Sequence, residues 1–300
     1  MQDIFFDIPG RDSWEQVRKV SKGWSSDEKY EIRTKQGEHL LLRVSDVRNL
    51  EEKKKEFQMI QKFNSLDVRM SQAVSFGTCK EGKCVYMLLS WVEGDDLEDV
   101  LPFLSKEAQY ELGWKAGKIL KKIHSIPLEQ EDIPKETKIP KKKRQLASYL
   151  ESDVRIPGDE AAVRFLEAHM DEIWSVPPVY LHGDFHPGNL VIGKDGQIGV
   201  IDFNRWEVGD PYEEFYKLQS FGKELSIPYC IGEIEAYFDH EIPKSFFSIL
   251  AVYVAHASLY SIKWAEKFGE EDVAGMVKRC RAAFEDYDDF TRMIPKWYQY

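Results

Sequence analysis

Cysteine is scarce in this sequence, with four residues among 300, and only Cys79 and Cys84 lie close together. No second pair completes the spacing of a zinc site, so the thiols do not indicate a structural metal. Reduced thiols are the simplest account of such a scattered set, and they are typical of a cytoplasmic protein. We therefore expect a cytoplasmic location.

Basic residues are also in deficit, because 41 Lys and Arg stand against 52 Asp and Glu, for a net charge of −11. Nucleic acid and anionic lipid are bound through an excess of Lys and Arg. We therefore expect neither nucleic acid nor membrane as a partner. An acidic surface would instead attract a cationic small molecule.

Long apolar runs are nearly absent. The first residues, MQDIFFDIPGRD, include early acids and no basic segment, so we expect no signal peptide. Only the stretch 245–262 lacks formal charge and approaches the length that crosses a membrane. It carries His256 and several Ser and Tyr, which a lipid-facing helix disfavours. We expect it to be a helix buried in a helical domain.

No internal repeat or low-complexity segment occurs, but the character of the chain changes after Glu93 and Gly94. Before that point strands dominate, with one helix; the predicted strands cover 14–20, the region of 30–34, 40–44, 73–76 and 84–91, and the helix covers 50–64. After it, helical spacing dominates. The fold class predicted is α+β, with an N-terminal lobe over 1–92 and a helical C-terminal lobe over 93–300. The basic run 141–144 is expected to be solvated surface.

One segment between the helical regions concentrates polar residues that can do chemistry. Two short apolar runs, 190–192 and 198–201, flank the turn Lys194-Asp195-Gly196, which predicts a β-hairpin. A hairpin brings its outer ends together, so Asn189 and Asp202 are expected to meet. Asp184 lies on the loop that leads into the first strand.

This set of groups suits phosphoryl transfer. A nucleoside triphosphate is highly anionic, so a divalent cation must neutralise charge on it. Magnesium prefers oxygen ligands and takes only one or two from the protein, which fits Asn189 and Asp202. A separate carboxylate must receive the proton of the acceptor hydroxyl, and Asp184 is available if the other two hold the metal.

The block His-Gly-Asp-Phe-His-Pro-Gly-Asn over 182–189, followed by Ile-Asp-Phe over 201–203, resembles the catalytic and metal-binding segments of the aminoglycoside phosphotransferase and choline kinase-like family. That family has a protein-kinase-like fold of two lobes. The resemblance implies that Asp184 is the catalytic base, that Asn189 and Asp202 bind Mg²⁺, and that Arg205 lies near the base and the substrate. It also implies that His182 supports the loop.

The resemblance extends weakly over the rest of the chain and implies a nucleotide site. Ser25 and Ser26 match a loop that covers the phosphates, Arg43 matches a strand residue that holds them, and Glu56 matches the ion-pair partner of that residue. The segment 86–94, with Ser90, Trp91 and Val92, resembles the hinge that binds the purine. Two departures are present. Ser90 stands where relatives carry Glu, which leaves ATP and GTP both open, and Glu213-Glu214 stands where Asp is usual.

These observations predict a phosphotransferase with an alcohol group as acceptor, most simply an aminoglycoside kinase of the kind that confers antibiotic resistance. Its partners would be a nucleoside triphosphate and a cationic small molecule. Other acceptors stay open, among them a macrolide, choline or ethanolamine, and homoserine. A nucleotide-binding scaffold without catalysis is a further alternative, although Asp184, Asn189 and Asp202 are all present. Reading His182, Asp184 and His186 as transition-metal ligands is the least favoured alternative.

Overall fold

The computed structural model describes residues 5–21 and 27–299, and the chain divides into two compact units. The first unit comprises Met1–Asp96 and Asn189–Trp206, and the second comprises Leu97–Gly188 and Glu207–Tyr300. The sequence predicts a boundary after residue 92 and a C-terminal lobe that includes 189–206. In the structure this short segment returns to the unit that contains the N-terminal strands.

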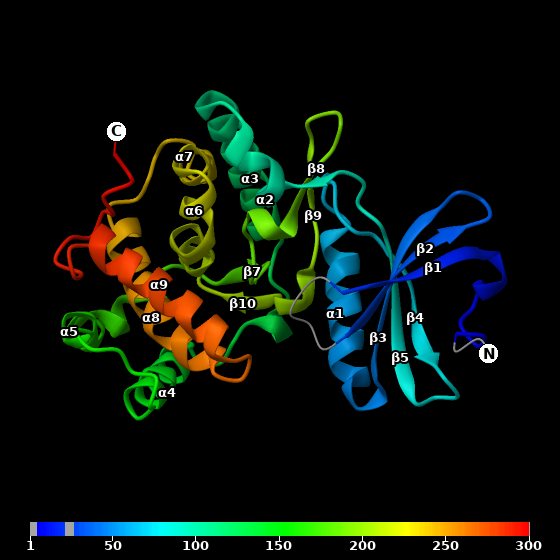
Figure 1. The fold of residues 1–300 in the computed structure, drawn as a ribbon, viewed down its shortest axis with the longest axis horizontal. Helices are drawn as coiled ribbons and strands as arrows, with labels where there is room; N and C mark the ends of the chain where they lie inside the picture. Colours follow the sequence, from blue (N-terminus) through cyan, green and yellow to red (C-terminus); the bar gives the residue numbers. More distant parts are fainter. Residues whose placement is uncertain (1–4, 22–26, 300) are drawn as a thin grey trace. The chain divides into compact units, whose positions relative to one another are not determined.

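A five-stranded antiparallel sheet forms the body of the first unit, in the order β1-β2-β3-β5-β4 (Figure 1). Its strands are β1 (Trp14–Val20), β2 (Glu28–Thr34), β3 (His39–Asp46), β4 (Ala73–Cys79) and β5 (Cys84–Ser90). All five lie where the sequence predicted strands. The helix α1 (Leu50–Phe63) also agrees with its prediction and packs against the sheet (Figure 1).

Alternation along β2 separates the two faces of this sheet. Tyr30 and Ile32 belong to a buried cluster with Phe5, Trp14 and Leu42. Residues in between point to the other face, because successive side chains of a strand alternate. Lys29, which directly precedes Tyr30, also points to that face, and the register places it directly opposite Arg43 of β3. The polar face of the sheet therefore carries two cations, Lys29 and Arg43, side by side on adjacent strands.

A second, small sheet belongs to the same unit and has the order β6-β8-β9. It consists of β6 (Asp95–Asp96), β8 (Leu190–Ile192) and β9 (Ile198–Val200). Val200 also forms a bridge to Met70, which follows α1. The predicted hairpin is therefore confirmed, and its two strands are held on the first unit by pairing on both sides.

The second unit is mainly helical. Its helices are α2 (Leu97–Val100), α3 (Lys106–His124), α4 (Ile139–Leu150), α5 (Glu160–His169), α6 (Lys223–Leu225), α7 (Ile227–Tyr237), α8 (Phe246–Ala265) and α9 (Glu270–Asp286), and a two-stranded sheet pairs β7 (Val179–Leu181) with β10 (Glu207–Gly209). The α+β class is therefore as predicted, with a sheet-rich unit and a helical unit (Figure 1).

The uncharged stretch predicted as a buried helix is α8. By length and composition alone α8 could cross a membrane, but 72% of its apolar window is buried inside the protein. His256 on this helix is buried, and burial holds its pKa well below the ordinary value. The basic run 141–144 differs from expectation at one position, because Lys142 is buried and pairs with Glu213 at 2.6 Å. It lies on the inner face of α4, so the run is only partly solvated surface.

Helices α3 and α7 approach each other closely because glycines line their contact. A Cβ atom at Gly113 would lie 2.0 Å from the carbonyl oxygen of Tyr229, and one at Gly117 would lie 2.2 Å from that of Glu233. No side chain can occupy either position without moving a backbone. This packing buries the Glu233 side chain, and burial raises its pKa to about 8, with a further contribution from the nearby Glu214.

A raised carboxyl pKa predicts that Glu233 destabilises the fold as the pH increases. The folded state holds the proton up to about pH 8, whereas the unfolded chain releases it near the ordinary glutamate pKa of 4.5. The contribution of Glu233 to stability is therefore fully present below pH 4.5 and is lost as pH rises to about 8. In this window the free energy of unfolding of Glu233→Gln should rise, relative to that of the native protein, by roughly 1 kcal/mol per pH unit. Urea unfolding at pH 5, 6, 7 and 8 measures the difference.

Packing changes caused by the glutamine do not vary with pH, so only the slope of the difference is diagnostic. The exposed Glu241 provides a matched control, because Glu241→Gln removes a carboxylate that is not buried. A constant offset between Glu233→Gln and the native protein across the four pH values would show that Glu233 is ionised in the folded state.

Candidate active site

The β8–β9 hairpin brings Asn189 and Asp202 to one end, as predicted. Leu190 pairs with Val200, and the Ile201 N–H donates to the Asn189 carbonyl at 3.1 Å. The turn at the other end requires Gly196, whose φ of 71° lies in the left-handed region. Asp202 follows Ile201 directly, so the two oxygen-bearing side chains flank the open end of the hairpin.

The backbone at Asp202 adopts a left-handed conformation, with φ 63° and ψ 63°. Few residues other than glycine tolerate this region, and Asp is among those that do. The bend lets the next residue, Phe203, bury its ring against Phe63 of α1 at 5.0 Å between centroids. The Asp202 side chain keeps 25% of its surface exposed. The bend at Asp202 therefore lets the Phe203 ring anchor the chain while the Asp202 carboxylate stays partly exposed.

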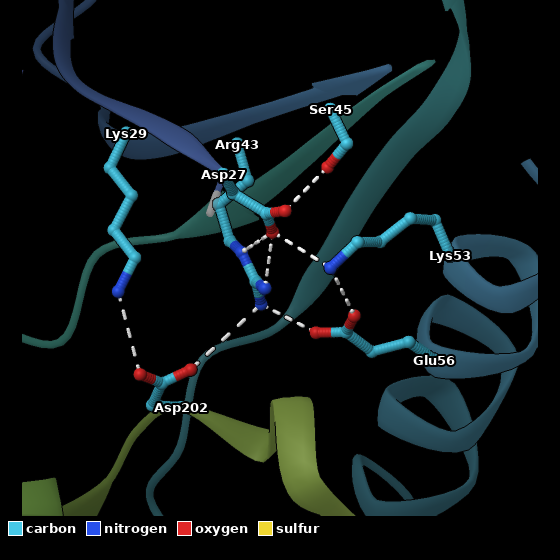
Figure 2. Close-up of polar contacts among 7 residues, drawn as sticks. All are labelled: Asp27, Lys29, Arg43, Ser45, Lys53, Glu56 and Asp202. Atoms are coloured by element: carbon cyan, nitrogen blue, oxygen red, sulfur yellow. Dashed lines mark hydrogen bonds and ion pairs between the residues drawn. The ribbon is translucent and has the colours of Figure 1, made fainter. Parts of the chain in front are cut away.

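Two cations of the main sheet face Asp202 (Figure 2). Its Oδ2 lies 3.4 Å from the Lys29 Nζ, and its Oδ1 lies 4.0 Å from the Arg43 Nη1. Because Lys29 and Arg43 are opposite each other in the β2–β3 register, both side chains leave the same face of the sheet. The sequence analysis identified Arg43 here but not Lys29.

The predicted ion pair between Arg43 and Glu56 is present. Arg43 Nη1 donates to Glu56 Oε1 at 2.5 Å, and both side chains are buried (Figure 2). Glu56 comes from α1, thirteen residues after Arg43, so the pair ties the helix to the central strand of the sheet. A buried charge without such a partner would cost several kcal/mol.

Asp27 is a site residue that the sequence analysis missed. Its Oδ2 accepts from Arg43 Nε at 3.0 Å and from Lys53 Nζ at 2.8 Å, and its Oδ1 accepts from Ser45 Oγ at 2.6 Å (Figure 2). Burial would raise the pKa of Asp27, but the charges of Arg43 and Lys53 outweigh it and hold the pKa at about 2. Asp27 is therefore a carboxylate at any physiological pH.

Lys53 was missed as well, although its spacing was a usable signal. It precedes Glu56 by three residues on α1, and its ammonium lies 3.0 Å from Glu56 Oε2. With it the network has three carboxylates, Asp27, Glu56 and Asp202, and three cations, Lys29, Arg43 and Lys53 (Figure 2). The charges balance within the cluster, and this offsets the cost of removing them from water. Ser25 and Ser26, predicted to cover the phosphates, lie outside the described residues.

The predicted hinge leaves β5 at Ser90. The Ser90 N–H donates to the Gln72 carbonyl at 2.8 Å, and the Trp91 N–H donates to the His39 carbonyl at 2.9 Å. The Trp91 ring stacks on the His39 ring at 4.5 Å with an interplanar angle of 14°. The Trp91 ring is thereby engaged with β3, and the N–H groups of Ser90 and Trp91 both have backbone partners.

The loop that carries Asp184 belongs to the second unit and is held by Glu214. The Glu214 carboxylate accepts from the N–H of His182 at 3.0 Å and from the N–H of Gly183 at 2.8 Å. His182 is fully buried, and its Nδ1 accepts from the Asp184 N–H at 3.2 Å. Glu214 therefore anchors the loop from the position where the resemblance led us to expect Asp.

The carboxylate of Asp184 has two neighbours that the sequence did not reveal as a group. Lys217 Nζ donates to Asp184 Oδ1 at 2.5 Å, and His186 Nε2 lies 3.7 Å from the same oxygen. The His186 ring stacks on Phe221 at 5.0 Å between centroids. Lys217 is 33 residues away from Asp184, and no local pattern connects them.

The remaining predicted residue, Arg205, ends the short turn Phe203–Arg205 and is exposed. It lies in the first unit with Asn189 and Asp202, whereas Asp184 lies in the second. Asp210, in the sequence Gly-Asp-Pro over 209–211, has a structural role. It accepts from the N–H groups of Trp174 and Tyr212 and from the Tyr253 hydroxyl.

The donor set at the hairpin fits magnesium rather than a transition metal. Across the residues the structure describes, no three His, Cys, Asp or Glu side chains gather as a metal site. The transition-metal alternative for His182, Asp184 and His186 therefore finds no support there. Asn189 and Asp202 supply hard oxygens, and Asp202 meets its present cations only at 3.4 and 4.0 Å. At these distances the two cations hold the Asp202 carboxylate only weakly. It is therefore available to a small divalent ion, which takes few protein ligands.

Comparison with known proteins identifies the class. The profile of the phosphotransferase enzyme family, APH, matches residues 16–245. The chain belongs to this family, and it is a phosphotransferase with an alcohol group as acceptor, as the sequence predicted. A search of curated proteins finds no match.

Solved structures agree on the protein-kinase-like α+β fold. The GDP complex of wild-type aminoglycoside 2'-phosphotransferase-IIIa is 15% identical, with a TM-score of 0.69, over 91% of this chain and 93% of that one. The gentamicin complex of APH(2'')-IIa is 18% identical, with a TM-score of 0.67, over 89% and 91%. A thermostable mutant of APH(4)-Ia, with ADP and hygromycin B, is 18% identical, with a TM-score of 0.66, over 91% and 94%.

Proposed function

We propose that this phosphotransferase moves the γ-phosphoryl group of ATP or GTP onto a hydroxyl of a small molecule, most simply an aminoglycoside. The observation that carries the proposal is the network of Arg43, Glu56 and Asp202 at the open end of the hairpin (Figure 2). A buried cation beside a partly exposed carboxylate suits a polyanionic ligand that arrives with a divalent ion.

In this proposal each residue has a defined task. Asp184 orients the acceptor hydroxyl and receives its proton. The acceptor oxygen forms a bond to the γ-phosphorus while the bond to the bridging oxygen breaks, and the electron pair leaves with the nucleoside diphosphate. Asn189 and Asp202 would hold Mg²⁺, which when bound neutralises charge on the phosphates. Arg205 would balance charge near the base.

The nucleotide would bind through the sheet of the first unit. Ser90, Trp91 and Val92 would meet the purine, and Arg43 with Glu56 would order the phosphate side. Ser25 and Ser26 would donate to phosphate oxygens. The similar solved structures include complexes with GDP and with ADP, and this supports both donors equally. The choice between ATP and GTP is left to the assay.

Two lines of support favour an aminoglycoside acceptor. The net charge of −11 attracts a polycation, and the similar solved structures include complexes with gentamicin and hygromycin B. With such an acceptor the activity would modify an antibiotic in the cytoplasm and confer resistance.

One observation favours a different small hydroxyl acceptor. Acidic residues near the C-terminus would suit a polycation, but two of them are already paired: Asp286 with Lys223 and Gln219, and Asp288 with Lys296. A polycation that uses several of these acids would have to displace the lysines, whereas an acceptor with a single cationic group would not. A macrolide, choline or ethanolamine, or homoserine therefore stays the second candidate.

A coupled assay of nucleotide consumption tests the proposal. ATP and GTP are each combined with Mg²⁺ and with aminoglycosides, macrolides, amino alcohols and homoserine. Acceptor-dependent release of nucleoside diphosphate, with phosphorylated acceptor found by mass spectrometry, is the expected result. Nucleotide binding without transfer to any acceptor would instead support the scaffold alternative.

A further inference from the structure

Lys217 is a buried lysine whose ammonium meets the predicted catalytic base. Only 5% of its side chain is exposed, and its Nζ donates to Asp184 Oδ1 at 2.5 Å. Both residues lie in the second unit. Lysine is almost never buried to this degree unless it is paired. The partner here is the carboxylate assigned to proton transfer rather than an acid of the hydrophobic core.

The surroundings of Lys217 hold its ammonium in place. The ring of Tyr216 lies 5.0 Å from Nζ and that of Phe221 lies 5.3 Å from it, within the range of a cation–π contact. Phe221 also stacks on His186, which approaches the same oxygen of Asp184. Lys217 and His186 thus approach the same oxygen of Asp184, and the Phe221 ring contacts both of them.

The backbone that carries Lys217 is irregular. A π-helical segment, Leu218–Gly222, begins immediately after it and includes Phe221. Such segments widen the helical turn by one residue, cost stability and occur frequently at functional sites. Here the wider turn places the ammonium of Lys217 and the ring of Phe221 beside each other and toward the loop of Asp184.

We propose that Lys217 is a positioning residue for phosphoryl transfer, which acts by fixing Oδ1 of Asp184 and stabilising its carboxylate before the acceptor arrives. This inference rests on the proposed function of Asp184 as base. When the hydroxyl proton passes to Asp184, Lys217 loses its counter-charge. The ammonium therefore favours a late proton transfer, after the bond to the leaving group has largely broken, in keeping with a loose transition state.

Lys217→Met tests the inference, because it keeps most of the apolar stem and removes the charge. We expect kcat to fall by about 10- to 100-fold, the cost of a misplaced catalytic group. The KM for the nucleotide should stay within about twofold, since Lys217 acts on the base and the loss lies in the transition state. Lys217→Arg, which restores a cation, should recover most of the lost kcat.

Lys142 offers a matched control in the same unit. It is also buried, with 9% of its side chain exposed, it pairs with Glu213 at 2.6 Å, and its Nζ lies 5.1 Å from the ring of Tyr253. Lys142→Met removes an equivalent buried ion pair away from Asp184. It should lower the stability to urea by an amount similar to Lys217→Met, while kcat stays within about twofold of the native value.

The outcomes separate this inference from the function on which it rests. A native protein that transfers phosphate to no acceptor in the panel overturns the proposed function, and this inference with it. An active native protein whose Lys217→Met variant keeps its kcat overturns this inference alone. Equal losses of kcat in Lys217→Met and Lys142→Met, or no recovery in Lys217→Arg, would reduce Lys217 to a structural ion pair and contradict a positioning role.

Discussion

Replacing Asp184 by Asn should lower kcat by a factor on the order of 10² to 10⁴ while nucleotide affinity is retained. The amide has the shape of the carboxylate but cannot take the hydroxyl proton. The loop itself should persist, because Glu214 holds it through the N–H groups of His182 and Gly183, and neither bond involves the Asp184 side chain. Steady-state kinetics with the best acceptor, together with calorimetry of nucleotide binding, measures the two quantities separately.

The same substitution leaves Lys217 without its carboxylate, so a stability measurement must accompany the kinetics. Asp153 supplies the control, because it is exposed in the same unit and Asp153→Asn removes one carboxylate without touching the loop. Unchanged turnover in Asp184→Asn would remove this residue from the role of base. A parallel loss of nucleotide binding would point to an unfolded loop instead.

Local spacing explains why the hairpin could be predicted from the sequence. The residues between Asn189 and Asp202 contain two short apolar strands and a glycine turn, and a two-stranded pairing allows only one register that keeps the apolar side chains buried. The observed pairing of Leu190 with Val200 follows this rule. The juxtaposition of Asn189 and Asp202 therefore needs no long-range information.

Most of the side chains that the prediction missed depend on contacts between distant segments. Asp27, which directly precedes β2, reaches Arg43 because β2 pairs with β3 in one register, and a shift of that register by one residue would change which residue of β3 it meets. Lys217 reaches Asp184 through an irregular helical turn that periodicity cannot predict. The resemblance places Glu213-Glu214 where Asp is usual. Only the structure shows that Glu214 holds the loop of Asp184, while Glu213 pairs with Lys142.

Replacing Asp202 by Ala should abolish transfer, with a loss of about 10³-fold or more, because the charge stabilisation supplied by a catalytic metal is worth several kcal/mol. The structure adds a second expectation. Asp202 is one of three carboxylates that balance Lys29, Arg43 and Lys53, so its removal leaves a surplus positive charge in the network (Figure 2). Nucleotide affinity in EDTA should therefore stay the same or increase, while the gain in affinity on adding Mg²⁺ should disappear.

Calorimetric titration of ADP with Mg²⁺ and with EDTA separates these two effects for each variant. Asp195 supplies the control, because it lies in the turn of the same hairpin, and 65% of its side chain is exposed. Asp195→Ala should keep the full magnesium-dependent gain. If Asp202→Ala kept that gain as well, the hairpin would not be a metal site, and the cations around Asp202 would be its permanent partners rather than groups that a magnesium-bound nucleotide displaces.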